Sequence, residues 1–506
     1  MLMALSLLAL VQVVAVSCSG AMLVKCLRLK QECQNEDRIS ALPDHILLGI
    51  LERLDLHAAI QASTLSRRWA HLPRSFSRLV IDVAHFLPRD RNKRETCTVD
   101  QIMTAYTAAV RRLLPSSPSS DHRAAGMKQL QLCFYLTDPY LCSIGHAIGD
   151  VVELGNTVFF ELTLVADTRR PSYEQCILFG ERLMFFFRAC PVTFRWLTGL
   201  ILDNITFQDS DVNDLLNACS KLQFLSMTNC DSAFDPVTGE DVVLKIDVPH
   251  SALLALEIRT CGYPRVDLIQ APKLRRLVCT DWTGASPPLS FGNVPCLDNM
   301  NLCHAALHWQ TAFLLSQCLS GTTTLSIMYL NFGDEMIWIE PEDPKRLTHI
   351  FSNLREVYLY NIFYECDLNW TMFVLEAAPS LNNLYLKLSR HPCERNRCKD
   401  SAKKVNLLWD QASPHFKHRQ LSLLEIVGFA MDEKLVKYIR LVMERAVGLK
   451  RIRLLDQQPC AKCDAMDNAQ SPSPVRWRFP AEEEEKKLIR QQLVDGFSSP
   501  VEIIIG

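Results

Sequence analysis

The sequence has 506 residues, of which 48% are apolar, a formal net charge of −2 and a pI near 6.7. This length predicts about three domains with sizeable cores. A net charge so close to zero argues against a nucleic-acid binder that works by neutralising phosphates. The 20 cysteines are spread along the chain without a compact framework, which is typical of buried thiols in a reducing compartment.

The first 20 residues, MLMALSLLALVQVVAVSCSG, resemble a secretory signal, because an apolar run is followed by small residues. The run lacks a basic segment before it and is shorter than a membrane-spanning helix of about 20 residues. Two sequons, Asn204-Ile-Thr and Asn369-Trp-Thr, would suit secretion. We nevertheless expect residues 1–36 to form a signal-like or disordered leader that does not direct secretion, because the segments that follow argue against it.

The stretch 42–72 contains two short helical patterns. Apolar residues recur at helical spacing over residues 42–54, and a second apolar pattern covers residues 60–72. Pro43 suits the first turn of a helix, where its missing N–H costs little. Two short helices cannot bury both apolar stripes and also cover Trp69, so some face must meet a third helix or a partner.

Residues 37–72, DRISALPDHILLGILERLDLHAAIQASTLSRRWAHL, resemble a plant-type F-box. They match its D-R-I-S-x-L-P-D-x-I-L start almost position by position, and also its later A-x-x-x-x-L-S-x-R-W. The resemblance implies a three-helix F-box over residues 37–85 that binds the adaptor subunit of an SCF ubiquitin ligase and, through it, cullin. The adaptor-binding residues that it implies are Leu42, Pro43, Ile46, Leu47, Leu51, Leu65 and Trp69. A helical hairpin within a larger core is the alternative interpretation.

Residues 86–126 are expected to be a linker. PSSPSSD, at residues 115–121, has the composition of a linker or surface loop. PRDRNKR, at residues 88–94, carries four basic residues, which fit either a solvated loop or a nuclear import signal.

Residues 127–410 repeat the pattern L-x-x-L-x-L, with other apolar residues and an occasional Thr allowed. Good copies begin at Leu197, Leu222, Leu253, Leu274, Leu354, Leu381, Leu421 and Leu449, the last two beyond this range, and weaker copies at Met127, Thr157, Leu297 and Thr322. This is an irregular leucine-rich-repeat signature. Each copy predicts a short strand whose alternate apolar residues enter a core that only stacked neighbours can bury. The outward strand residues are then free to bind a partner.

Several copies are followed by Asn or Cys, at Asn204, Asn229, Cys261, Cys303 and Asn361. We expect these residues to turn the chain and to hydrogen-bond the backbone between neighbouring coils.

Residues 421–456 read as strand, helix, strand. The helix is expected to bury one apolar stripe formed by Leu435, Ile439, Val442, Met443 and Ala446. The layout resembles the FBD domain that accompanies F-boxes and leucine-rich repeats in plant proteins, here over residues 411–460. Residues 461–506 are expected to be a C-terminal tail, in which AEEEEKK at residues 481–487 forms a solvated helix face.

The sequence contains no recognisable pattern of catalytic or metal-binding residues. Cys460-Ala-Lys-Cys463 is a lone C-x-x-C without a second pair at zinc-finger spacing, although His391, Cys393 and Cys398 could contribute ligands. The sequence contains no P-loop, G-x-G-x-x-G, H-E-x-x-H or G-x-S-x-G. We therefore expect no catalytic residue, no metal and no cofactor.

Together these patterns predict an α/β protein with an N-terminal three-helix F-box, an irregular leucine-rich-repeat solenoid shaped as a horseshoe, and an FBD-like strand-helix-strand region. The resemblances imply a non-catalytic substrate-recognition subunit of an SCF-type E3 ubiquitin ligase, located in the cytoplasm, the nucleus or both. Its target protein is unknown, and neither a nucleic acid nor a membrane is an expected partner. The rival interpretation is a secreted or membrane-associated leucine-rich-repeat binding protein that uses the leader, and a third is an enzyme with a novel site.

Overall fold

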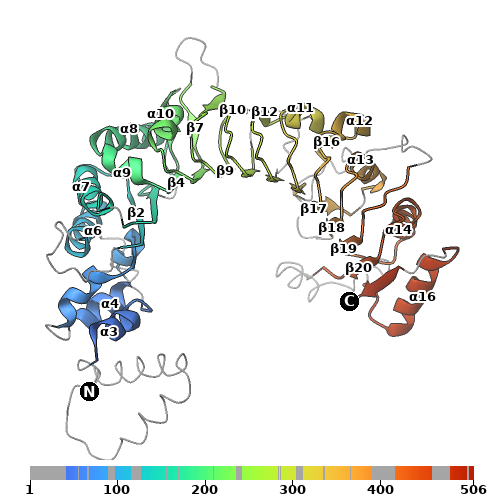
Figure 1. Ribbon diagram of the computed structural model, residues 1–506, viewed down its shortest axis with the longest axis horizontal. Coiled ribbons are helices and arrows are strands. Elements are labelled where there is room, and N and C mark those ends of the chain that lie inside the picture. Colours follow the sequence, from blue (N-terminus) through green and yellow to red (C-terminus); the bar gives the residue numbers. More distant parts are fainter. Residues whose placement is uncertain are drawn as a thin grey trace, which may run out of the picture. The chain divides into compact units, whose positions relative to one another are not determined.

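The computed structural model of the chain contains a helical N-terminal module and, farther along the chain, a long run of parallel strands (Figure 1). The described residues are 42–54, 56–64, 68–88, 97–114, 127–154, 156–168, 170–208, 210–234, 242–282, 284, 287–303, 311–333, 337–364, 366–389, 416–457, 479–497 and 501–506. The leader, Leu65 and the cysteines of the C-x-x-C lie outside them. The chain divides into two compact units, residues 1–163 and 164–506, which are taken in turn.

Unit 1 begins with the helices of the predicted F-box. Its elements are α3 (Asp44–Leu51), α4 (Leu56–Ser63), the 3-10 helix η1 (Trp69–Ser75), β1 (Arg78–Asp82), the 3-10 helix η2 (Val83–Phe86), α6 (Val99–Leu113), β2 (Gln129–Tyr135), α7 (Leu141–Val152) and β3 (Phe159–Val165), which ends just past the boundary. The third helix of the predicted F-box is thus a 3-10 helix. Pro73 lies inside it, and proline is poorly tolerated within an α-helix because it lacks an N–H and clashes with the preceding turn.

The segment predicted to be a linker contains a structured helix. Thr98 and Gln101 form a reciprocal capping box at the start of α6, and six residues of this helix are buried. Among them, Tyr106 packs its ring against Phe86 and Phe134 and donates its hydroxyl to the carbonyl oxygen of Ile81 at 3.3 Å. Residues 97–114 are therefore part of the core of unit 1 and differ from the expected linker.

Unit 2 is built on a run of parallel strands. In sheet order these are β4 (Gly199–Asp203), β6 (Phe224–Thr228), β9 (Ala255–Arg259), β11 (Arg276–Thr280), β13 (Asn299–Cys303), β15 (Ile327–Asn331), β17 (Glu356–Phe363), β18 (Asn383–Ser389), β19 (Leu423–Val427), β20 (Arg451–Leu455) and β21 (Glu502–Ile505). The helices along the chain are α8 (Tyr173–Ala189), α9 (Pro191–Trp196), α10 (Asp211–Ala218), α11 (Leu315–Leu319), α12 (Pro344–Leu347), 3-10 helix η3 (Asn369–Thr371), α13 (Met372–Ala377), α14 (Glu433–Arg445) and α16 (Glu483–Val494). In Figure 1, α10 to α14 lie along one side of these strands.

The strands pair in a register that repeats the sequence pattern. Two residues of each strand point inward, to the core. In neighbouring strands these inward residues lie opposite one another, as Leu200 does to Leu225. These inward residues are buried along the whole run from β4 to β20. The prediction of stacked copies with a shared core is confirmed, and the alternate residues of each strand form a second, outward face.

Short extra strands lie beside this run. β8 (Leu244–Asp247), β10 (Val266–Gln270) and β12 (Leu289–Asn293) form a parallel sheet of their own, and β5 (Thr206–Phe207) pairs with β7 (Asp231–Ser232). β14 (Phe313–Leu314) pairs with β16 (Ile339–Glu340) in the same way. The returning segments of unit 2 are therefore partly strands and not only helices.

The residue after many of the strands has a left-handed backbone. Asn204, Asn229, Thr260 and Asp281 all have φ between 50° and 58°, and each donates its N–H to the last residue of the next strand. Gly428 takes the same place after β19, where φ is 84° and a Cβ would meet the carbonyl oxygen of Leu388 at 2.4 Å. The expected turn after the strand is confirmed for Asn204 and Asn229, whereas Asn361, with φ of 52°, lies within β17.

Three strands of the long parallel sheet differ from the predicted copies. Every other predicted copy starts two residues before its strand, and β15 starts at Ile327. The copy that was predicted to start at Thr322 therefore starts at Leu325. β1 and β21 follow no predicted copy, and β21 pairs with β20 in the segment expected to be a tail. The predicted helix stripe on α14 is confirmed, with Leu435, Ile439, Val442, Met443 and Ala446 all buried.

A buried histidine joins two coils across the segment 390–415. Nδ1 of His418 accepts the backbone N–H groups of Gln420 and Leu421, and Nε2 lies 2.9 Å from the carbonyl oxygen of Ala378. The ring is therefore neutral, with its proton on Nε2. Burial lowers the pKa of His418, and the hydrogen bond to Ala378 opposes that effect in part.

The first prediction concerns pH. Because the folded chain binds a proton at His418 less readily than the unfolded chain, whose histidines titrate near pH 6.5, the free energy of unfolding should fall as the pH drops below that value. Urea unfolding at about pH 7.5 and about pH 5.5 should show a smaller pH dependence in His418→Gln than in the wild type. His349→Gln, at an exposed histidine, is the matched control, and an equal pH dependence in wild type and His418→Gln would contradict the assignment.

The second prediction concerns the end of the repeat run. A chain that stops at Ser389 leaves the edge of β18 unpaired, because β19 normally hydrogen-bonds to it, and it also uncovers apolar core. We expect this fragment to aggregate, as measured by size-exclusion chromatography with light scattering. A soluble monomer that unfolds cooperatively would contradict this prediction and show that the chain up to β18 folds without residues 390–506.

Candidate binding surfaces

The predicted adaptor-binding residues divide into an exposed and a buried group. Pro43 and Ile46 are exposed and Leu42 is half-buried, and these three lie at the N-terminal end of α3. Leu47, Leu51 and Trp69 have exposed fractions of 0%, 1% and 5%. Leu65 lies outside the described residues. The expectation that Leu47 is open to a partner is not met, because α3 turns this side chain into the core of unit 1.

Polar contacts fix the position of α3. Asp44 Oδ1 accepts two hydrogen bonds from the guanidinium of Arg68, which also donates to the carbonyl oxygen of Leu42 at 2.7 Å. At the other end of α3, Glu52 Oε1 accepts the backbone N–H and the hydroxyl of Ser77, just before β1. These contacts hold the N-terminal end of α3 so that Pro43 and Ile46 face solvent.

A hollow of about 430 Å³ separates the F-box helices from α6. Its lining is mainly apolar, with Leu56, Ile60, Phe86, Ala105 and Ala109 among the contributors, and His85 and Arg112 supply polar groups. The hollow lies within unit 1. None of its lining residues is on α3, so it is separate from the exposed end of that helix.

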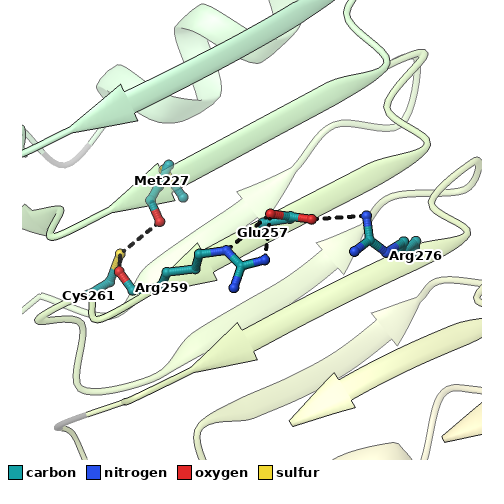
Figure 2. A network of polar contacts seen from close by, with 5 residues as sticks. All are labelled: Met227, Glu257, Arg259, Cys261 and Arg276. Atoms are coloured by element: carbon teal, nitrogen blue, oxygen red, sulfur yellow. Dashed lines mark hydrogen bonds and ion pairs between the residues drawn. The ribbon is translucent and has the colours of Figure 1, made fainter. Parts of the chain in front are cut away.

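The outward face of unit 2 carries charged groups that are paired with one another. Glu257 on β9 accepts hydrogen bonds from Arg259 and forms an ion pair with Arg276 on β11 at 2.9 Å (Figure 2). On the same face, Glu425 on β19 pairs with Arg453 on β20 at 2.6 Å. The pair of strands β9 and β11 therefore has an excess of positive charge, since one carboxylate serves two arginines.

Figure 2 also shows how a cysteine joins neighbouring coils. The thiol of Cys261 donates to the carbonyl oxygen of Met227 at 3.5 Å, and that of Cys230 lies 4.0 Å from the carbonyl oxygen of Leu202 in the preceding coil. The expected hydrogen bond from a cysteine to the backbone is thus confirmed at Cys261. Cys303 is the last residue of β13 itself.

A row of tyrosines crosses the outward face farther along. Tyr329, Tyr358 and Tyr385 lie opposite one another on β15, β17 and β18, and we call these three residues the tyrosine ladder. Their rings stack at centroid distances of 4.2 and 4.3 Å and are parallel within 12° and 3°. Tyr360 lies beside them with its ring at 69° to that of Tyr358. All four side chains are partly exposed.

Glu356 lies on this face two residues before Tyr358. Its Oε2 accepts the hydroxyl of Tyr358 at 2.6 Å. Burial, together with this bond to a carboxylate, raises the pKa of Tyr358 well above its usual value. Within the described part of the chain, no cation forms an ion pair with Glu356, unlike Glu257 and Glu425.

The tyrosine ladder was not predicted from the sequence, although a signal was present. Tyr358 and Tyr385 occupy the same outward position of two successive copies, LREVYL and LNNLYL. Tyr329 occupies that position too once its copy is read as LSIMYL from Leu325. Placing the copy at Thr322 put this tyrosine out of register with the others.

Several of the described cysteines are buried thiols. None of the thirteen forms a disulfide with another described cysteine, and burial raises the pKa of Cys219 and of Cys318 to about 12. Such thiols remain protonated at neutral pH and are poor nucleophiles. The described ranges also contain no group of three or more His, Cys, Asp or Glu side chains placed to hold a metal ion. The candidate ligands His391, Cys393, Cys398, Cys460 and Cys463 lie outside them.

The two sequons have structural partners in the fold. The hydroxyl of Thr206 donates to Asp231, and that of Thr371 shares a hydrogen bond of 2.8 Å with the hydroxyl of Tyr438. Both threonine side chains are buried. The threonine of each sequon therefore has a structural role in the fold, as a buried hydrogen-bonding residue. None of the described helices has the length and apolar character needed to cross a membrane.

Comparison with known proteins matches the first part of unit 1 and most of unit 2. Residues 163–489 match the family model described as the At1g61320/AtMIF1 LRR domain, over more than half of the chain. The chain belongs to this leucine-rich-repeat family. Residues 39–80 match the F-box domain, which confirms the resemblance in α3, α4 and η1 and rules out a helical hairpin of another kind.

The chain is also similar to three proteins of Arabidopsis thaliana. It is 24% identical to the F-box/FBD/LRR-repeat protein At1g13570 over 71% of this chain and 78% of the relative. It is 24% identical to the F-box/FBD/LRR-repeat protein At5g22660 over 83% and 90%. The F-box protein At1g80960 is 48% identical over 50 residues, or 10% of each chain. Residues 421–456 form the strand-helix-strand layout that was compared to an FBD, and two of these relatives carry FBD in their names.

The third prediction follows from the burial of Leu47. Leu47→Ala should lower the free energy of unfolding by about 2–5 kcal/mol, because it leaves a cavity in the core of unit 1. Chemical unfolding followed by circular dichroism measures this change. A loss below about 1 kcal/mol would show that Leu47 is not enclosed by the chain itself.

Proposed function

We propose that this chain is a substrate-recognition subunit of an SCF-type ubiquitin ligase. The observation that carries the proposal is the combination, in one chain, of an F-box domain over residues 39–80 and a leucine-rich-repeat domain over residues 163–489. The F-box binds the adaptor subunit and, through it, cullin, while the outward strand face of unit 2 binds a target protein. We place this activity in the cytoplasm, the nucleus or both.

The mechanism requires no catalytic residue in this chain. By holding the target and the adaptor at the same time, the protein raises the effective concentration of the target's lysines near the loaded conjugating enzyme. The bonds are made and broken by the partners. Buried thiols of high pKa, such as Cys219 and Cys318, are consistent with this passive role.

The exposed end of α3 is the part of the F-box that supports adaptor contact best. Pro43 and Ile46 present apolar surface to solvent beside the half-buried Leu42. Exposed apolar side chains that adjoin one another are typical of a protein interface. Leu47, Leu51 and Trp69 then support this surface from within, and their contribution to adaptor binding is indirect.

The fourth prediction tests this surface. Ile46→Asp should reduce affinity for the adaptor about tenfold or more, because it removes an apolar contact and places a charge in the interface. The fold should be unchanged, since Ile46 is 40% exposed. Leu154→Asp is the matched control, because Leu154 is 44% exposed and lies two residues after the end of α7 in the same unit.

Adaptor affinity is measured with purified full chain and recombinant adaptor, by calorimetry, and folding is checked by circular dichroism. The proposal predicts weak binding for Ile46→Asp and wild-type binding for Leu154→Asp. If a folded Ile46→Asp chain binds the adaptor as well as wild type does, the assigned surface is wrong. If the wild-type chain itself does not bind the adaptor, the proposed function fails.

A further inference from the structure

We propose that Glu356 and the tyrosine ladder bind an arginine side chain within an extended segment of the target protein. This inference deepens the proposed function, on which it rests, by naming the chemistry that the target presents. It is carried by three features of the outward face of unit 2: an arrangement of aromatic rings, an unpaired carboxylate, and the distribution of charge around them.

The rings are arranged before any partner binds. Tyr329, Tyr358 and Tyr385 stack on one another at 4.2 and 4.3 Å, so each ring holds its neighbour in place. Because the sheet register already fixes the three side chains, a partner does not have to order them. Tyrosine combines a flat apolar ring with a polar tip, and it is enriched where proteins bind other proteins.

The carboxylate of Glu356 completes the site. Its Oε2 is held by the hydroxyl of Tyr358, and the described residues supply no ion-pair partner for it. Two other carboxylates on this face, Glu257 and Glu425, are already neutralised, the first by two arginines and the second by Arg453. Unlike these two, the carboxylate beside the tyrosine ladder can gain from a cation brought by the target.

The chemistry of the site favours arginine among the cations. A guanidinium can donate hydrogen bonds to a carboxylate and stack on aromatic rings at the same time, whereas an ammonium is a more strongly hydrated point charge. Glu356 and the tyrosine rings offer both kinds of contact side by side. An arginine placed here would use the carboxylate and the rings together.

The surrounding charges restrict where the basic residue can lie. Lys387 is on the outward face of β18, two residues beyond Tyr385, and so lies on the opposite side of the tyrosine ladder from Glu356. Toward β9 and β11 the face has one carboxylate for two arginines. On the β19 side, Glu425 lies opposite Tyr385 but is already paired with Arg453. A second basic residue of the target would thus meet repulsion toward Lys387 and toward β9 and β11, so we expect one arginine and not a basic run.

The experiment uses the purified full chain and four pools of fluorescent dodecapeptides. Each pool has degenerate positions around a fixed central residue, which is arginine, lysine, citrulline or glutamate. Citrulline has the shape of arginine without its charge, so the ratio of arginine to citrulline binding isolates the charge. Affinities are measured by fluorescence anisotropy for the wild type and for Glu356→Gln, Tyr358→Ser and Arg276→Gln, with thermal unfolding as the folding control.

For the wild type we expect the arginine pool to bind about tenfold more tightly than the citrulline pool, with lysine between them, because a hydrogen bond to a charged partner is worth about that factor. Glu356→Gln should bring this ratio close to one. Tyr358→Ser should weaken the binding of the arginine and the citrulline pools alike. Arg276→Gln changes the same face outside the tyrosine ladder and should leave the ratio unchanged.

Several results would overturn the proposal. These are equal binding of the arginine and citrulline pools, preference for the glutamate pool, no measurable binding of the arginine pool, or an unchanged ratio in folded Glu356→Gln. Adaptor binding is measured on the same preparations, so a failure of the proposed function can be distinguished from a failure of the proposed target chemistry. If the adaptor binds and the peptide ratio fails, the target chemistry is wrong while the proposed function stands; if the adaptor does not bind, the proposed function itself fails.

Discussion

The in-register pairing of parallel strands is the constraint on which unit 2 depends. Because side chains alternate between the two faces of a strand, pairing Leu200 with Leu225 and continuing this register buries every inward residue of the following strands. The same register aligns the outward residues in rows. The stack of Tyr329, Tyr358 and Tyr385 is therefore a direct consequence of the pairing that forms the core, as are the ion pairs of Glu257 and Glu425 with arginines on the next strands.

The turns after the strands maintain this register. Asn204, Asn229, Thr260 and Asp281 adopt a left-handed backbone, and their N–H groups bind the end of the next strand. Asparagine and aspartate tolerate this conformation better than most residues, and the glycine at 428 does so without cost. A chain that reverses direction in the same way after each strand keeps successive coils at the same height, so its outward side chains remain in rows.

Elements whose sequence signals lie within a few residues were predicted correctly. Elements whose position depends on contacts between residues far apart in the sequence were not. The L-x-x-L-x-L copies and the amphipathic stripe of α14 are patterns within a few residues, and the structure confirms them. The copy at Thr322 was misplaced because three consecutive threonines obscured its start at Leu325, and this error hid the tyrosine ladder. The strand β21 is short and polar at its start, and its pairing with β20 is separated by about fifty residues of sequence.

The F-box shows a similar division between motif and environment. The motif residues were predicted as one contact surface, yet Leu47, Leu51 and Trp69 are buried while Pro43 and Ile46 are exposed. A motif records which side chains a family requires, without separating those that touch a partner from those that support them. Packing of α3 against η1, and the contacts of Asp44 and Glu52, determine that separation, and both depend on residues twenty or more positions away.

The central claim is that one chain carries two separate binding surfaces, the exposed end of α3 for the adaptor and the outward strands of unit 2 for the target. Hydrogen exchange of the full chain, with and without a saturating amount of recombinant adaptor, tests this claim most directly. The account predicts slower amide exchange in peptides that cover residues 42–54, with no change in peptides from β15, β17 and β18. Protection of those strands by the adaptor, or no protection of residues 42–54, would contradict it.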